Sequence, residues 1–337
     1  MIFASLKGSH YEVGVQHGRG FREVIHCVIR QWCRFFDPKR RPGHRAIQDR
    51  ADALKAEYPQ LLEEMGGIAD GAEVPLEDVL VLNLGPWSSS CTNIAFCDSD
   101  EGPILGHVND HKPGGHFDAV FAVELSGGTR LLYVGSAGAL GSGAGVNSAG
   151  LAISHAQARP MSGENAAQVL NMNLHSRALL EGCRDSAEAE ALLREHAFRS
   201  GADNIIVMDA SGHGFVAERY PDLVDFRGVE KGAIYCTNRT LAPGTRRMTD
   251  QDNYERTAKE IAGLVGRERY LQRLIDEHQG RFTQELMERI LRCTEEDAKI
   301  CNAFSNWAAI LFPRRTEMLL ADRFPCHSEF RRYVVES

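Results

Sequence analysis

A cysteine and an aspartate bracket the stretch of sequence with the clearest chemical potential. Cys91 opens one apolar run, Asp110 closes a second one, and the polar turn at 98–103, rich in Asp, Gly and Pro, separates the two runs. Two strand-like runs joined by such a turn predict a β-hairpin. Because a hairpin places its two ends side by side, we expect Cys91 and Asp110 to lie close together in space.

This pair has a catalytic meaning if the chain is cut between Ser90 and Cys91, through attack of the Cys91 thiol on the Ser90 carbonyl. A thiol is a weak nucleophile until it is deprotonated. The α-amino group freed by the cut has a reference pKa of about 8, so it can take the thiol proton at neutral pH. Asp110 could then orient the amine. The alternative is that Cys91 is a small apolar core residue and Asp110 an ordinary turn cap.

Further blocks of sequence accompany this hairpin in a fixed order. They are GSHYEVGVQHG, EEMGGIADGAEVPLEDVLVLN, CTNIAF with its G-x-x-N-D ending, GVNSAGLAIS, DNIIVMDASGHGFVAE and YCTNRT. Together they cover most of the chain, and they resemble the penicillin acyltransferase (isopenicillin N acyltransferase) family of N-terminal-nucleophile cysteine hydrolases. The chain is similar, more distantly, to the conjugated bile acid hydrolases.

The resemblance implies a fold and a set of catalytic residues. The fold is α+β, a four-layer αββα sandwich of antiparallel sheets. Self-cleavage would release a mostly helical N-terminal α-chain, 1–90, from a catalytic β-chain, 91–337, and the two would stay together as an α/β heterodimer. Cys91 is then the nucleophile, Asp110 matches the aspartate near its amine, and Asn238 matches the asparagine whose side-chain amide helps to stabilise the oxyanion. By itself, an asparagine such as Asn238 is more often a turn residue. No cofactor is implied.

Three further positions are candidates for substrate contacts. His107 stands where the bile acid hydrolases carry an arginine, and Arg239 begins a pair that replaces a His-Phe pair of the penicillin enzyme. Asn147 is either a turn residue or a donor in the pocket. Ser90 departs from the glycine that often precedes the cysteine in this family.

These departures bear on the substrate. Because an imidazole is largely neutral at pH 7 and a guanidinium is not, His107 predicts a small N-acyl amide whose acyl part is not strongly anionic. Bile-salt conjugates should be poor substrates unless Arg239 or Arg177 supplies a positive charge. The acyl group would pass to water or to an acyl-acceptor amine, and the sequence does not separate these two outcomes.

Composition excludes several other classes of protein. The 337 residues are 43% hydrophobic and 25% charged, with a net charge of −8 and no basic stripe, so we expect no nucleic-acid partner. No apolar run is long enough to span a membrane. Nine cysteines without metal-ligand spacing predict no metal site and favour reduced thiols. With no signal-peptide core at its start, the chain is expected to be cytoplasmic.

The pattern of predicted elements agrees with two sheets flanked by helices. Strands cluster with strands and helices with helices, which argues against a βαβ repeat. Expected helices include 11–36, 46–67 with a break near Pro59, and two within 165–196; a last hairpin spans 302–312 and 317–321. Two function classes remain open, a self-maturing cysteine amidohydrolase or acyltransferase and a non-maturing relative that binds a ligand or partner.

Overall fold

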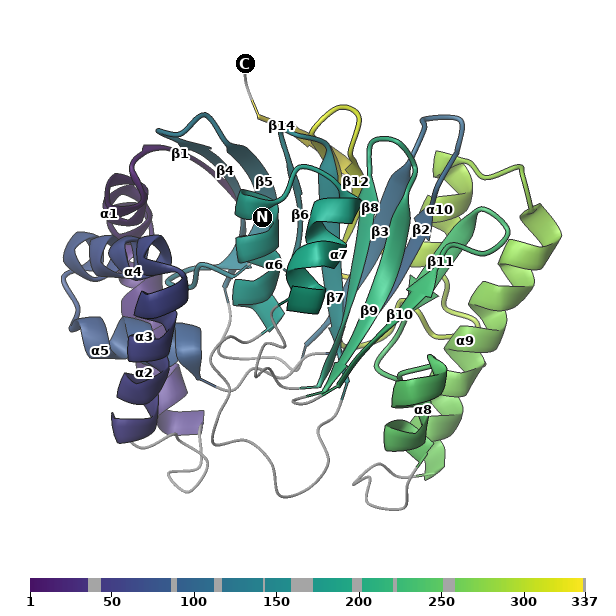
Figure 1. The fold of residues 1–337 in the computed structure, drawn as a ribbon, viewed down its shortest axis with the longest axis horizontal. Coiled ribbons are helices and arrows are strands. Elements are labelled where there is room, and N and C mark those ends of the chain that lie inside the picture. Colours follow the sequence, from purple (N-terminus) through teal and green to yellow (C-terminus); the bar gives the residue numbers. More distant parts are fainter. Residues whose placement is uncertain are drawn as a thin grey trace.

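The computed structural model describes residues 1–35, 44–85, 90–111, 117–141, 143–158, 172–195, 202–220, 223–250 and 258–335. Its strands form two sheets (Figure 1). In spatial order, the eight-stranded sheet contains β1 (Ile2–Gly8), β4 (Asp118–Leu125), β5 (Arg130–Ser136), β6 (Ala144–Asn147), β7 (Leu151–Gln157), β8 (Asp203–Asp209), β9 (Gly214–Tyr220) and β10 (Leu223–Gly228). The six-stranded sheet contains β11 (Ala233–Cys236), β2 (Ser90–Phe96), β3 (Ile104–Asp110), β12 (Ser305–Phe312), β13 (Glu317–Asp322) and β14 (Arg331–Val334).

Helices cover the outer faces of both sheets (Figure 1). On the eight-stranded sheet lie α1 (His10–Gly20), α2 (Arg22–Phe35), α3 (His44–Glu57), α4 (Pro59–Ala72), α5 (Leu76–Leu84), α6 (Met172–Gly182) and α7 (Ser186–Glu195). On the six-stranded sheet lie α9 (Ala258–His278) and α10 (Gln284–Leu291), while α8 (Pro243–Asp250) follows β11. Residues 165–171, at the start of the region expected to hold two helices, lie outside the described residues.

The apolar core has three parts, one for each contact between layers. The first joins α1–α7 to the eight-stranded sheet, the second fills the space between the two sheets, and the third joins the six-stranded sheet to α9 and α10. This is the predicted α+β, four-layer αββα sandwich. The expectation of antiparallel sheets holds for every strand pair except β1 with β4, which is parallel. A parallel pair requires a long crossover, and here the connection contains α1–α5 and the β2–β3 hairpin of the other sheet.

The hairpin around Cys91 is confirmed. β2 and β3 pair in antiparallel register over their full length, with Ser90 opposite Asp110 and Cys91 opposite Asn109. β11 flanks β2, and β12 flanks β3. Cys91 therefore lies on a central strand of the sheet and pairs with Asn109 of β3, while the pairing of β2 with β11 extends only from Phe96 to Asn93.

Small residues allow the N-terminal helices to pack closely. A Cβ at Gly14 would lie 2.1 Å from the Glu64 carbonyl oxygen, and one at Gly18 would lie 2.4 Å from that of Ile68, so α1 and α4 make the close helix contact expected from the sequence. The expected break within 46–67 is confirmed, since α3 ends at Glu57 and Pro59 begins α4. The expected helix from Tyr11 is likewise two helices, separated at Phe21.

Candidate active site

The candidate site lies on the inner face of the six-stranded sheet, where β2 faces the other sheet. Side chains alternate along the strand. Cys91, Asn93 and Ala95 point into the space between the sheets, because Cys91 and Ala95 belong to the inter-sheet core and Asn93 contacts Ser154 of β7. Cys91 is fully buried.

Asn238 meets the backbone of Cys91. Its Oδ1 accepts a hydrogen bond from the Cys91 backbone N at 3.1 Å, and its Nδ2 donates to the Gln157 carbonyl at 2.7 Å. The sequence analysis placed these two residues in one site, and the structure brings them into contact. The amide oxygen of Asn238 faces the Cys91 backbone, whereas the expectation was that its NH₂ group would face the oxyanion. The bonded nitrogen is the atom that cleavage would convert into the α-amino group.

Two residues that the sequence analysis missed hold the loop that carries Asn238. Asn204 of β8 donates from Nδ2 to the backbone carbonyls of Thr237 and Arg239, at 2.7 and 2.8 Å. Glu268 of α9 accepts from the Thr237 hydroxyl at 3.0 Å and from Arg239 at 2.9 Å. The signal for Asn204 was a polar residue inside an apolar strand; Glu268 left no local signal. The guanidinium of Arg239 is thus partly neutralised at the edge of the site.

Asp110 is held by residues from the C-terminal part of the chain. Its carboxylate accepts hydrogen bonds from Ser305 at 2.6 Å, Asn302 at 2.8 Å and Arg267 of α9 at 3.1 Å. Burial raises the pKa of the Asp110 carboxyl, while these three partners act in the opposite direction. Arg267 also contacts Thr92, on the outer face of the sheet. Asp110 therefore ends β3 beside the Ser90 backbone but directs its carboxylate toward α9.

His107 lies deep between the sheets. Its Nδ1 is 2.7 Å from both Asn93 Oδ1 and Ser154 Oγ, and its ring packs against Trp307. Burial lowers the pKa of His107 well below its ordinary value, and His155 adds to this. The imidazole is therefore neutral, and it offers no charge to an anionic substrate.

Asn147 has the contacts of a turn residue. Its Nδ2 donates to the carbonyls of Leu180 and Cys183 at the end of α6, and its Oδ1 accepts from the backbone of Ala149 and Leu151. These four hydrogen bonds join the β6–β7 turn to α6. They favour the turn alternative over a role in the pocket.

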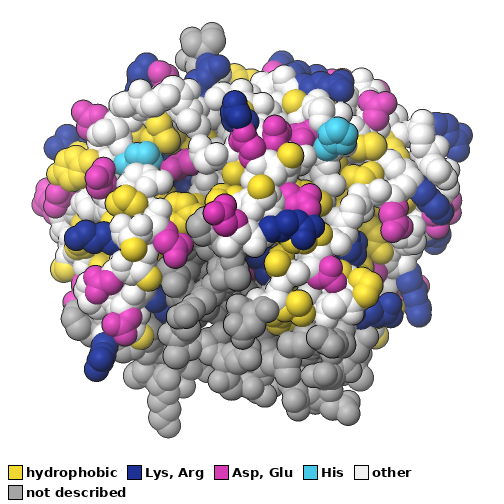
Figure 2. Space-filling model, in the orientation of Figure 1, with side chains coloured by type: hydrophobic (Ala, Val, Ile, Leu, Met, Phe, Trp, Pro, Cys, Tyr) yellow, Lys and Arg dark blue, Asp and Glu magenta, His cyan; other side chains and the backbone are white. Residues whose placement is uncertain are grey.

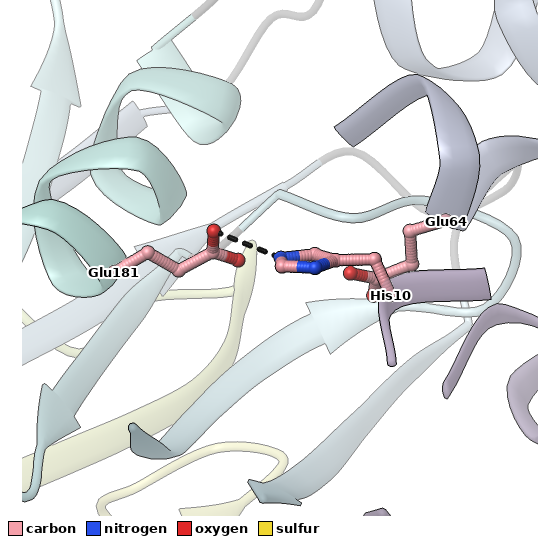
Figure 3. Close-up of side chains that lie close together, drawn as sticks. All are labelled: His10, Glu64 and Glu181. Atoms are coloured by element: carbon pink, nitrogen blue, oxygen red, sulfur yellow. Dashed lines mark hydrogen bonds and ion pairs between the residues drawn. The ribbon is translucent and has the colours of Figure 1, made fainter. Parts of the chain in front are cut away.

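Arg177 lies outside the site, on the outer side of the eight-stranded sheet. Fully buried, it pairs with Glu64 of α4 at 2.7 Å and with Glu181 at 2.5 Å. His10 of α1 contacts Glu181 at 3.2 Å (Figure 3). The ligand-type atoms of His10, Glu64 and Glu181 lie within 4.8 Å of one another, as in a metal site. Because Arg177 already neutralises both carboxylates, this group is an ion-pair network rather than a metal site.

The described surface agrees with the bulk properties of the sequence. On the face shown in Figure 2, acidic and basic side chains are interspersed, and no basic stripe crosses its coloured part. Across the described ranges, none of the helices combines the length and apolar character needed to cross a membrane. Each cysteine whose side chain is described carries a free thiol.

Three solved structures are similar to most of this chain. A Caenorhabditis elegans ortholog of N-acylethanolamine-hydrolyzing acid amidase is 16% identical, with a TM-score of 0.47 over 73% of this chain and 100% of that one. Penicillin V acylase from Agrobacterium tumefaciens is 12% identical, with a TM-score of 0.40 over 69% and 83%. A mutant conjugated bile acid hydrolase from Clostridium perfringens is 11% identical, with a TM-score of 0.45 over 72% and 96%. No curated protein matches the sequence.

The family comparison is more direct. The family model described as acyl-coenzyme A:6-aminopenicillanic acid acyl-transferase matches residues 97–308, which is more than half of the chain. The match includes Asp110 and Asn238, and it begins just after β2, so that Cys91 lies outside it. The four-layer sandwich is the fold expected for such a protein. The chain belongs to the acyl-coenzyme A:6-aminopenicillanic acid acyl-transferase family, has a four-layer αββα fold, and is an enzyme.

Proposed function

We propose that this protein is a self-processing N-terminal cysteine amidohydrolase or acyltransferase. In the first step the Cys91 thiol attacks the Ser90 carbonyl carbon, a C–S bond forms, and the Ser90–Cys91 C–N bond breaks. Water then hydrolyses the resulting thioester. The products are a carboxylate at Ser90 and a free α-amino group beside the thiol of Cys91, in two chains, 1–90 and 91–337, that remain associated.

In the mature enzyme the new amine acts as the base. It takes the thiol proton, the sulfur attacks the carbonyl carbon of an N-acyl amide, and the proton passes to the departing amine. The acyl group is left on Cys91 as a thioester. Water resolves it in hydrolysis, and a second amine resolves it in acyl transfer.

The observation that carries this proposal is the hydrogen bond from the Cys91 backbone nitrogen to Asn238 Oδ1. An acceptor already faces the nitrogen that would become the catalytic amine, so the amine needs no new partner after the cut. The Cys91 thiol also lies close to a hydrogen-bond donor, since Asn109 Nδ2 is 4.0 Å from Cys91 Sγ. This geometry supports a catalytic cysteine over a cysteine that only packs in the core.

The charged side chains that could attract an anionic substrate are already paired or neutral, which supports an acyl group without strong negative charge. His107 is neutral, Arg239 pairs with Glu268, and Arg177 pairs with two glutamates on the far side of a sheet. We therefore propose a small neutral or amine-bearing N-acyl amide as substrate. Release of amine from a panel of acyl amides that differ only in charge tests this, and preference for an anionic conjugate would contradict it.

Two cysteine variants, one on β2 and one just beyond its end, test the mechanism. Cys91→Ala should abolish amide turnover, because alanine has no nucleophile. Cys97→Ala, just beyond the other end of β2, should retain it. A brief reaction with a thiol-directed acylating probe should label Cys91 of the cleaved protein first. Preferential labelling of Cys97 or Cys236 would move the active thiol elsewhere.

A further inference from the structure

The side chain beside the Cys91 thiol on the neighbouring strand is that of Asn109. The Cys91 N–H points toward Asn238, which follows β11, and therefore away from β3. Cys91 and Asn109 thus form a non-hydrogen-bonded pair of the antiparallel ladder, the type in which opposite side chains lie closest. Accordingly, Asn109 Nδ2 is 4.0 Å from Cys91 Sγ.

The other polar atom of this side chain, Oδ1, is buried. Asn109 is 9% exposed, and no donor among the described residues forms a hydrogen bond with its buried Oδ1. The neighbouring Asn93 differs, since its Oδ1 accepts from Ser154 and lies 2.7 Å from His107 Nδ1. A buried acceptor without a donor is costly. Its presence one strand from the thiol indicates that a donor arrives with another molecule.

The position of Asn109 beside the thiol indicates which group of a bound substrate would donate to its Oδ1. The future amine lies on the β11 side of the thiol and Asn109 lies on the β12 side, where Trp307 is its ladder partner. A substrate carbonyl carbon bonded to Cys91 Sγ would carry its amide nitrogen within this same confined space. Given the proposed function, on which this inference rests, we propose that Asn109 Oδ1 accepts the N–H of the scissile amide, which makes Asn109 a specificity residue that selects secondary amides.

The test compares three substrates that share one neutral acyl group: an anilide, its N-methyl derivative without the N–H, and the phenyl ester. The value of kcat/KM is used because it reports acylation of the free enzyme. Asn109→Leu should lower kcat/KM for the anilide roughly ten- to hundredfold and change that for the ester less than about threefold. The N-methyl anilide should be a poor substrate of the wild type and should lose little further activity in the variant.

Two further variants keep the result interpretable. Asn109→Asp retains the acceptor oxygen and should retain most of the anilide-to-ester ratio. Asn83→Leu makes the same substitution at another buried asparagine, one whose amide already bonds to Val79, Gly138 and Leu140, and it should leave the ratio unchanged.

The possible failures are distinguishable. Equal losses on anilide and ester, or no loss on either, would overturn the assignment of Asn109. An Asn109→Leu protein that folds but stays uncut would assign the residue to self-cleavage instead. If the wild type cleaves itself but prefers the N-methyl anilide, only the inference on Asn109 fails. If none of the three substrates acylates the wild-type protein, the proposed function is refuted, and this inference with it.

Discussion

Two buried polar regions of this molecule differ in how completely their groups are paired. Around Arg177, each charged side chain has an opposite partner: the guanidinium contacts Glu64 and Glu181, and Glu181 contacts His10 (Figure 3). Around Cys91, buried polar atoms of Asn109 and His107 have no hydrogen-bond partner within the described part of the chain. Burying an unpaired polar group costs free energy, so each such group calls for an explanation, and binding of a ligand is one. This difference favours a structural role for the Arg177 network, and it agrees with the ligand-binding and catalytic role that we propose for the Cys91 region.

The Arg177 network also joins the two segments that cleavage would separate. His10 and Glu64 lie before the Ser90–Cys91 bond, and Arg177 and Glu181 lie after it. Loss of the cation would leave carboxylates buried and unpaired. We therefore expect the network to keep 1–90 attached to 91–337.

The largest expected effect is that of Arg177→Met on stability. Breaking a buried ion pair by removing one partner costs about 3–5 kcal/mol. Denaturant unfolding should show this loss, and kcat of the protein that remains folded should change little. The control, Arg184→Met, removes an exposed i,i+4 pair with Glu188 and should cost less than about 1 kcal/mol. Equal stability of the two variants would contradict the role assigned to the network.

Asn238→Ala should act on rate rather than on stability. We expect kcat to fall about a hundredfold or more, as it does when an oxyanion donor is lost. The alanine variant also loses the acceptor for the Cys91 backbone nitrogen. Asn238→Asp keeps an acceptor for that nitrogen but loses the NH₂ group. Steady-state kinetics of both variants therefore separate the two contributions. An unchanged kcat with a raised KM would make Asn238 a substrate-positioning residue.

Acid should weaken the packing of α1 on the eight-stranded sheet. His17 accepts a hydrogen bond from the Gly138 backbone, and burial, with a contribution from Arg177, lowers its pKa to about 3. Below pH 6.5 the unfolded chain binds a proton at His17 that the folded chain does not. The stability that His17 contributes above pH 6.5 is therefore lost as the pH falls, by up to about 2 kcal/mol at pH 5.

His17→Gln isolates this contribution, since glutamine can accept the Gly138 hydrogen bond without titrating. The free energy of unfolding should fall less steeply from pH 7 to pH 5 in the variant than in the wild type. Identical slopes would mean that His17 takes up a proton without unfolding the region.

The smallest expected effect concerns His10 and has the opposite sign. Its hydrogen bond to Glu181 raises the pKa of His10, although partial burial acts against this. The stability it contributes is present below pH 6.5 and is lost as the pH rises through its raised pKa. Because the ring is partly exposed, the effect should be well under 1 kcal/mol. Unfolding of His10→Gln at pH 6 and pH 9 measures it, and a larger loss at pH 9 would be the wrong sign.

The sequence predicted those features of the fold that depend on local pattern. The turn at 98–103 and the apolar runs beside it were enough to place Cys91 beside the end of β3, and Pro59 was enough to divide two helices. Pairing between distant segments was not predictable in this way. The parallel contact of β1 with β4 and the short edge strand β14 depend on tertiary packing.

The sequence analysis named candidate residues for the site, but it did not predict the contacts that orient their side chains. The resemblance in YCTNRT singled out Asn238, but the direction of its amide depends on Gln157, which lies on another sheet. Asp110 was expected beside the amine, whereas Arg267 and Asn302, far along the chain, set the direction of its carboxylate. Contacts of this kind leave no periodic signal, since each depends on where a helix crosses a sheet.

The most direct test of the central claim is the intact mass of the purified protein. The account predicts two chains for the wild type, one ending at Ser90 and one beginning at Cys91, and a single full-length chain for Cys91→Ala. Cys97→Ala should be cut like the wild type. An uncut wild type would support the ligand-binding alternative, and a Cys91→Ala protein cut at the same bond would show that another protease, not the Cys91 thiol, makes the cut.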